Sequence, residues 1–205
     1  MKGFGEVPKS NLKSNKSKLN SQKQIVNHAI QLHIRGNISE ATKYYQNCIE
    51  QGIKDCRVFS NYGIILNNLG KLKDAELLYR KAIEIDPNYA NAHYNLGKLL
   101  CDLRRLKDAE FYTRKAIEIN PNFANAYSNL GKILYSLGKL KDAELSYRKA
   151  IHLNPSFTDA YYNLGNLFFE LNKLKDAELS YRKAIQLNPN FTAAHYNLGL
   201  SLIHI

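Results

Sequence analysis

Asparagine recurs along the chain at steps of 34 residues. The six positions are Asn27, Asn61, Asn95, Asn129, Asn163 and Asn197. A carboxamide both donates and accepts hydrogen bonds, so such a row could satisfy the backbone of an extended peptide whatever the peptide's sequence. The same groups could instead bond neighbouring elements of this chain. The chemistry that this row offers is recognition by hydrogen bonding.

The chain has no motif that would assemble a catalytic or metal site. It contains no phosphate-binding glycine loop, no nucleophile elbow and no HExxH zinc pattern. Cys48, Cys56 and Cys101 are odd in number and lack CxxC spacing, which indicates reduced thiols and a cytoplasmic location. His93 and His195 occupy an aromatic place in a repeated helix, where packing is expected. We therefore expect no enzyme activity, no cofactor and no metal.

Composition limits the other classes of function. No run of about 18 apolar residues offers a membrane-spanning helix, so no membrane partner is expected. The formal net charge is +11, and residues 1–21 hold five lysines against one glutamate. This favours a basic, disordered tail over 1–21, and weak nucleic-acid binding through it is a minor alternative. Abundant Lys, Asn and Ile without Trp indicates an AT-rich, bacterial genome.

Two helices must carry the asparagines, because the repeated unit of 34 residues contains two amphipathic patterns. Gly63, Gly97, Gly131, Gly165 and Gly199 recur at that step, as do the prolines. In residues 90–123, His93, Leu96, Gly97, Leu100 and Leu103 form the apolar face of a first helix, helix A. A second helix, helix B, begins at Leu106, with Asp108 in its first turn and Arg114 near its end.

The sequence also contains residues that end each helix. Gly70 and Gly138 end helix A in two repeats, and Asn172 ends it in a third, as expected for a left-handed residue. Arg104 stands at the same place and is the strained exception. Helix B ends before Pro87, Pro121, Pro155 and Pro189, because the residue preceding proline is excluded from helical backbone angles. Small residues such as Ala109 and Ala116 let the helices approach closely.

The order aromatic-x-x-Leu-Gly, then Ala, Tyr, Ala and Pro, at a period of 34, resembles tetratricopeptide repeats. The resemblance implies an all-α, right-handed solenoid of stacked antiparallel helix-turn-helix units. The expected repeat domain covers 22–205: a degenerate repeat at 22–55, full repeats at 56–89, 90–123, 124–157 and 158–191, and a lone terminal helix A at 192–205.

The resemblance further implies that the second face of helix A lines a concave groove that binds a protein or an extended peptide. We therefore predict a non-catalytic protein–protein interaction scaffold. The predicted groove residues are Asn61, Asn95, Asn129, Asn163, Asn197, Tyr94, Tyr162, Lys98, Lys132, Asn166, Tyr135, Phe169, Asp102 and Glu170. Tyr79, Tyr147 and Tyr181 on helix B are expected in the core, and Phe123, Phe157 and Phe191 between repeats.

Three further expectations concern partners and the chain's end. Similar arrays are often fused to glycosyltransferases, so the chain could instead be the substrate-recruiting part of a longer enzyme. Leu198, Leu202, Ile203 and Ile205 leave the last helix apolar, so it either caps the array alone, the interpretation that we favour, or pairs with a second chain as a homodimer. The fifth places of helix A lack the lysine of the subclass that clamps chaperone tails, so we predict no such clamp.

Overall fold

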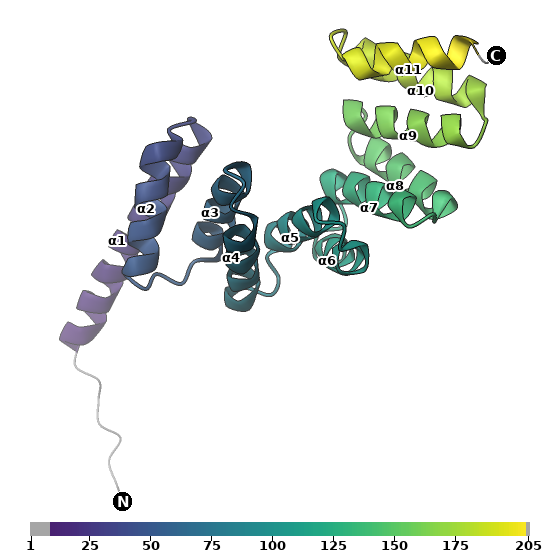
Figure 1. Cartoon of the computed structure of the whole chain (residues 1–205). Coiled ribbons are helices and arrows are strands. Elements are labelled where there is room, and N and C mark those ends of the chain that lie inside the picture. The colour runs from purple at the N-terminus through teal and green to yellow at the C-terminus, as the bar shows by residue number, and fades with distance from the viewer. Residues whose placement is uncertain (1–8, 204–205) are drawn as a thin grey trace, which may run out of the picture. The chain divides into compact units, whose positions relative to one another are not determined.

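The computed structural model consists of α-helices throughout the described residues, 9–203, and describes side chains for residues 19–202 (Figure 1). The helices are α1 (Lys9–Ile34), α2 (Ile38–Glu50), α3 (Cys56–Asn68), α4 (Leu72–Ile85), α5 (Ala90–Asp102), α6 (Leu106–Ile119), α7 (Ala124–Ser136), α8 (Leu140–Leu153), α9 (Thr158–Glu170), α10 (Leu174–Leu187) and α11 (Thr192–Ile203). From α3 onward, both helices A and helices B begin at intervals of 34 residues. The helical repeat predicted from the sequence is confirmed.

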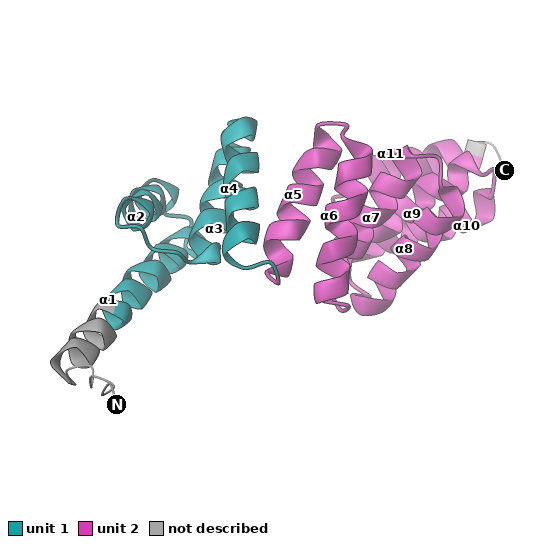
Figure 2. Cartoon of the chain, turned by 90° about the horizontal axis from the view of Figure 1, so that it is seen from below, with its two compact units in different colours: residues 1–87 teal, residues 88–205 magenta. Residues whose placement is uncertain are grey.

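The chain divides into two compact units, residues 1–87 and 88–205 (Figure 2). Unit 1 contains the pairs α1–α2 and α3–α4, and unit 2 contains α5 to α11. The boundary at Pro87 falls inside 22–205, the region that was expected to form one repeat domain.

Helix A and helix B of one repeat cross closely because helix A has a glycine at the crossing. A Cβ atom on Gly131 would lie 2.5 Å from Cε1 of Tyr147, and one on Gly165 would lie 2.6 Å from Cε1 of Tyr181. Both tyrosines are at most 2% exposed, as expected for core residues. The glycine is therefore required for the close contact and not for a special backbone conformation.

Consecutive repeats of unit 2 share one core. A cluster of buried residues joins α7, α8, α9 and α10, and it includes Leu134, Tyr147, Leu167, Phe168 and Tyr181. Leu198 of α11 packs against this cluster. Each repeat thus buries its apolar face against its neighbour, as solenoid repeats do.

Arg104 adopts the left-handed conformation predicted for it, with φ of 60°. Its turn closes as the turn at Gly138 does: Arg104 N–H donates to the Cys101 carbonyl at 3.0 Å, and Gly138 N–H donates to the Tyr135 carbonyl at 2.9 Å. Asn172 has φ of 55° at the equivalent place. A left-handed conformation costs a non-glycine residue roughly 1–2 kcal/mol, and asparagine less than most. Arg104 therefore carries strain that glycine would avoid.

The amino-terminal segment differs from the predicted disordered tail over 1–21. Helix α1 begins at Lys9, and residues 1–8 lie outside the described part of the chain. Residues 9–34 contain neither glycine nor proline, so nothing in the segment ends the helix before Ile34. The packed part of α1 comes later, where Val26, Ala29 and Leu32 are buried.

Candidate functional site

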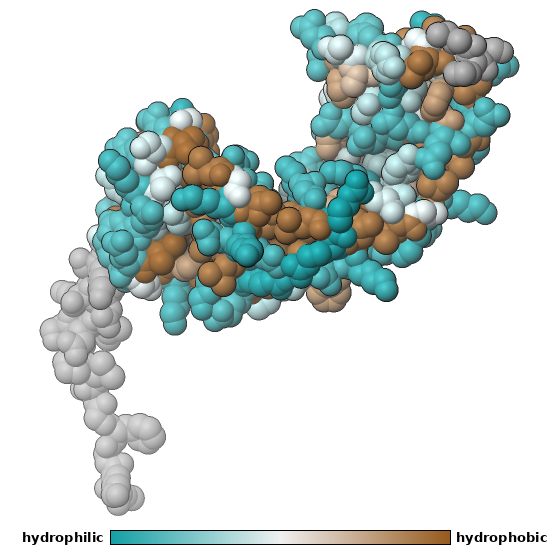
Figure 3. Space-filling model, viewed as in Figure 1, coloured by the Kyte–Doolittle hydropathy of each residue, from teal (hydrophilic) through white to brown (hydrophobic). Residues whose placement is uncertain are grey.

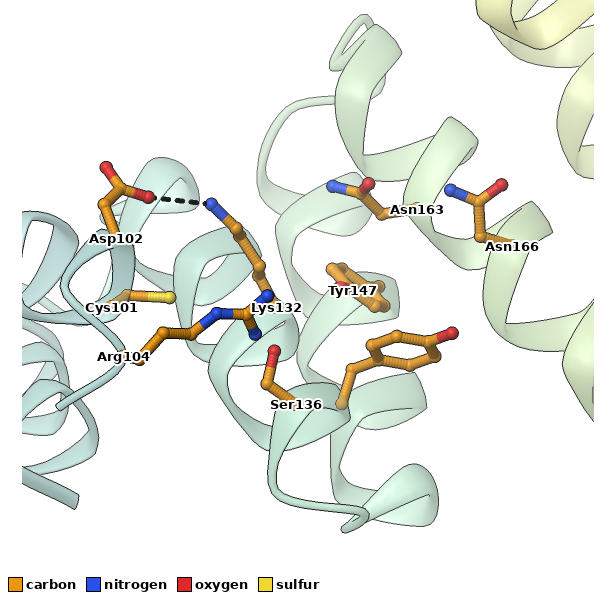
Figure 4. A pocket seen from close by; sticks show the side chains of 9 residues that line it. Cys101, Asp102, Arg104, Lys132, Ser136, Tyr147, Asn163 and Asn166 are labelled. Carbon is orange, nitrogen blue, oxygen red and sulfur yellow. Dashed lines mark hydrogen bonds and ion pairs between the residues drawn. The ribbon is translucent and has the colours of Figure 1, made fainter. Parts of the chain in front are cut away.

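Side chains from the second face of helix A line a cavity of about 530 Å³ in unit 2, here called the central cavity (Figure 4). Helices α5, α7 and α9 contribute most of its walls. Its lining residues are Cys101, Asp102, Arg104, Lys132, Tyr135, Ser136, Tyr147, Asn163 and Asn166. Most of its lining residues are polar or charged, and Tyr147 also belongs to the buried core cluster.

Two further cavities adjoin the central one. The aromatic cavity, of about 400 Å³, is lined by Tyr94, Lys98, Asn125, Ser128, Asn129, Lys132, Phe157, Asp159, Tyr162, Asn163 and Phe191. The C-terminal cavity, of about 200 Å³, is lined by Tyr135, Asn166, Phe169, Glu170, Tyr181, Asn197 and Leu200.

The three cavities are parts of one groove, here called the helix A groove. Lys132 and Asn163 line both the central and the aromatic cavity. Tyr135 and Asn166 line both the central and the C-terminal cavity. The groove therefore runs continuously over α5, α7, α9 and α11. These are the helices A of consecutive repeats, and each of them contacts the next.

Polar bonds link successive helices A across this groove. Lys132 Nζ lies 3.0 Å from Asp102 Oδ1, joining α7 to α5. The Tyr135 hydroxyl donates to Glu170, joining α7 to α9. The Lys132 and Asp102 side chains are 54% and 49% exposed, and an ion pair this exposed contributes roughly 0–1 kcal/mol. A ligand could therefore replace such a bond at little cost.

Tyrosine hydroxyls in the groove remain neutral hydrogen-bond donors. The hydrogen bond to Glu170, with burial and the glutamate's charge, raises the pKa of Tyr135 to about 12. Burial raises the pKa of Tyr181 to about 12 as well, and its hydroxyl donates to Asn166 Oδ1 at 2.9 Å. Both hydroxyls are therefore protonated and uncharged at neutral pH.

The asparagines of the row differ in their contacts within the chain. Asn129 is 8% exposed, and its Nδ2 donates to the buried Thr113 Oγ1 at 3.1 Å. Asn197 Nδ2 donates to Asn166 Oδ1 at 2.9 Å and to the Tyr162 hydroxyl at 3.2 Å. These two carboxamides bond neighbouring helices. Asn163, by contrast, has no hydrogen-bond partner within the described part of the chain and lines two cavities.

The structure brings most of the predicted groove residues together. Asn61 lies on α3 and so belongs to unit 1, and Asn95 is half-buried on α5 of unit 2. The other twelve predicted residues all line the three cavities. These residues line one groove, whereas their contact with a partner stays a prediction.

Sequence reasoning missed the groove residues that lie outside helix A. Arg104 comes from the turn after α5, and Phe157 and Phe191 directly precede α9 and α11. The phenylalanines were expected between repeats, and Phe191 does pack there, with its ring centroid 4.9 Å from that of Tyr162. The one available signal was Arg104, the charged residue at a glycine place.

Outside the groove, helix B combines ion pairs with exposed apolar side chains. Glu110 pairs with Arg114 and also with Lys139 of the next repeat, both at 2.9 Å. Burial opposes ionisation of Glu110, but these two bonds outweigh it and lower the pKa of its carboxyl group. Four leucine or phenylalanine side chains on helices B are more than half exposed: Leu77, Phe111, Leu145 and Leu179. Figure 3 shows hydrophobic residues reaching the surface among hydrophilic ones.

Neither a metal-binding cluster nor a membrane-spanning helix occurs among the described residues. Within 19–202, no three His, Cys, Asp or Glu side chains are placed to hold a metal ion. In the same region, no helix is long and apolar enough to cross a membrane. The three cysteines are free thiols, and burial raises the pKa of each.

Helix α11 packs on α10 and lacks a helix B of its own within the described residues. A Cβ atom on Gly199 would meet no atom within 4 Å, unlike the equivalent glycines of the full repeats. Leu202 is 47% exposed, whereas Ile205 lies outside the described residues. The role of α11 as a lone cap and the pairing of this edge with a second copy both stay predictions.

Comparisons with protein families identify the repeats. Residues 63–103, 114–138 and 131–171 match a family described as TPR repeat. Residues 90–123 and 158–191 match a family described as tetratricopeptide repeat. A comparison with curated proteins by sequence gives no match.

Solved structures show the same fold. One is YrrB, described as a TPR protein with an unusual peptide-binding site, at 23% identity and a TM-score of 0.67 over 89% of this chain and 95% of YrrB. Another is the segment of MamA from residue 41 to its end, from Desulfovibrio magneticus RS-1, at 24% identity and a TM-score of 0.70 over 83% of this chain and 97% of that segment. The pilF protein of Pseudomonas aeruginosa aligns at 17% identity with a TM-score of 0.74, over 92% of this chain and 91% of its own.

Proposed function

Because this chain belongs to the tetratricopeptide repeat family, whose members serve as protein-interaction scaffolds, we propose that its helix A groove binds an extended segment of a partner protein. The observation that carries the proposal is the continuity of the groove. Shared lining residues connect three cavities of about 530, 400 and 200 Å³ across four helices. A continuous groove accommodates a chain, whereas an isolated pocket would accommodate a small molecule.

The groove has the length of a short peptide. Packed helix axes lie roughly 8–10 Å apart, so α5 and α11, three steps from one another, are separated by about 24–30 Å. An extended peptide advances about 3.3 Å per residue, so seven to nine residues would cross the groove.

The lining residues supply the two kinds of contact that such a peptide requires. The unpartnered carboxamide of Asn163 lies where the central and aromatic cavities meet, and it can bond a peptide backbone from both its donor and its acceptor. In the aromatic cavity, Tyr94, Phe157 and Tyr162 offer apolar faces for one or two ligand side chains.

The test is selection from a displayed library of random nine-residue peptides on the full chain, followed by calorimetric titration of the selected peptides. Asn163→Ala should weaken binding about fivefold to tenfold, because one to two hydrogen bonds are lost, while the circular dichroism spectrum stays the same. Leu145→Ala, on the exposed face of α8, is the matched control and should leave the affinity unchanged. Equal affinities of wild type and Asn163→Ala would count against the groove, as would a loss confined to Leu145→Ala.

A further inference from the structure

The turn between α5 and α6 retains a residue that its backbone disfavours. Gly70, Gly138 and Asn172 hold the equivalent left-handed places, whereas this turn has Arg104, with φ of 60°. The backbone hydrogen bonds of the turn are those of the glycine turns, so the turn itself does not require arginine. Strain that persists at one position of a repeat points to a use for the side chain.

That side chain extends into the central cavity of the helix A groove. Figure 4 shows Arg104 and Lys132 both reaching into the cavity, with Ser136 on the same wall. Both cations act on the Cys101 thiol: burial and Asp102 raise its pKa, whereas Lys132 and Arg104 lower it. The Arg104 and Lys132 side chains thus both line the central cavity.

The charges in the cavity do not balance. Asp102 is the one carboxylate that lines it, and Asp102 already pairs with Lys132 at 3.0 Å. The Arg104 guanidinium has no hydrogen bond or ion pair to any residue of the described chain. The cavity thus holds one excess positive charge on a group with a planar fork of N–H donors.

We propose that the central cavity binds a carboxylate of the peptide in the helix A groove and that Arg104 is the residue that selects it. This inference rests on the proposed function. Arg104 donates two parallel N–H bonds to the carboxylate oxygens, and the Ser136 hydroxyl and the Asn163 carboxamide can supply further donors from α7 and α9.

A single carboxylate fits the groove better than a nucleic acid does. Asp102, Asp159 and Glu170 line the same groove, and they would repel the closely spaced phosphates of a polyanion. One acidic group placed at Arg104 avoids them. The expected partner is therefore a peptide with an acidic residue near its middle and apolar or aromatic residues toward the aromatic cavity.

The experiment uses the full chain and pairs of synthetic nine-residue peptides that differ at one position, glutamate or glutamine. The glutamate and the glutamine peptide both have an amidated C-terminus, and a third peptide combines glutamine with a free C-terminal carboxylate. Wild type should bind the glutamate peptide about tenfold more tightly than the glutamine peptide, with the difference decreasing as salt is added. If the third peptide binds more tightly than the glutamate peptide, the carboxylate that Arg104 selects is that of a C-terminus.

Two glycine substitutions distinguish the effect of the Arg104 side chain on the glutamate preference from the effect of relieving backbone strain. Arg104→Gly removes the cation and the strain together, so it should raise the melting temperature and abolish the preference for glutamate. Asn172→Gly relieves the equivalent place two repeats farther along the chain, between α9 and α10, and should keep the preference intact. The inference is overturned if Arg104→Gly retains the glutamate preference, or if selected peptides depend on Asn163 but not on an acidic residue. Absence of any peptide binding would overturn the proposed function as well.

Discussion

Gly131→Ala should destabilise unit 2 although alanine is the better helix former. The new Cβ atom would lie 2.5 Å from Cε1, 2.6 Å from Cδ1 and 2.9 Å from Cζ of Tyr147, distances well inside van der Waals contact. Tyr147 is 2% exposed and packs in the core shared by α7 to α10, so its ring cannot move without displacing other core residues. The substitution therefore overfills a close-packed interior.

The net effect follows from two opposed contributions. Overpacking of a core costs about 1–3 kcal/mol, and because three ring atoms clash we take the upper end. Replacing glycine by alanine within a helix returns about 1 kcal/mol. The expected loss in the free energy of unfolding is thus about 2 kcal/mol, which urea denaturation followed by circular dichroism would measure as a lower midpoint.

Gly199→Ala is the matched control, because it makes the same substitution at the equivalent place of α11. No atom lies within 4 Å of its Cβ position, so only the gain in helix propensity of about 1 kcal/mol remains. The reasoning is refuted if Gly131→Ala is as stable as wild type, or if Gly199→Ala loses stability.

Three further outcomes are expected. Asn129→Ala leaves the fully buried Thr113 hydroxyl without its donor and should lower the free energy of unfolding by about 1–3 kcal/mol in urea titration; an unchanged midpoint would contradict the bond. Burial holds the pKa of His33 below its ordinary 6.5, so the contribution of the neutral ring to the free energy of unfolding is fully present above pH 6.5 and is lost as the pH drops through the folded pKa. His33→Gln should therefore make the denaturation midpoint less dependent on pH between 7.5 and 5.5. The buried Cys101 thiol, its pKa raised mainly by burial, should react with iodoacetamide far more slowly in the folded chain than in urea, and equal rates would argue against its burial.

The sequence alone determined the helical repeat, because the signals for it are local. Apolar spacing within about 13 residues defines each helix, and a proline or a left-handed residue ends it. These signals act within one repeat, so the pairing of helix A with helix B and the place of Arg104 could be predicted. The start of α1 could not, since its first residues are polar and no local signal separates a solvated helix from a tail.

Only the tertiary structure decided which side chains meet in the groove. Asn129 and Asn163 occupy equivalent positions of two consecutive repeats, yet Asn129 bonds Thr113 and Asn163 faces two cavities without a partner among the described residues. The difference arises because one repeat has Thr113 where its neighbours have tyrosine on helix B. Likewise, the sequence places Arg104 in a turn, but its direction into the central cavity depends on α7 and α9, which lie about 30 and 60 residues farther along the chain. Contacts over such separations depend on how the repeats stack, and no local pattern encodes them.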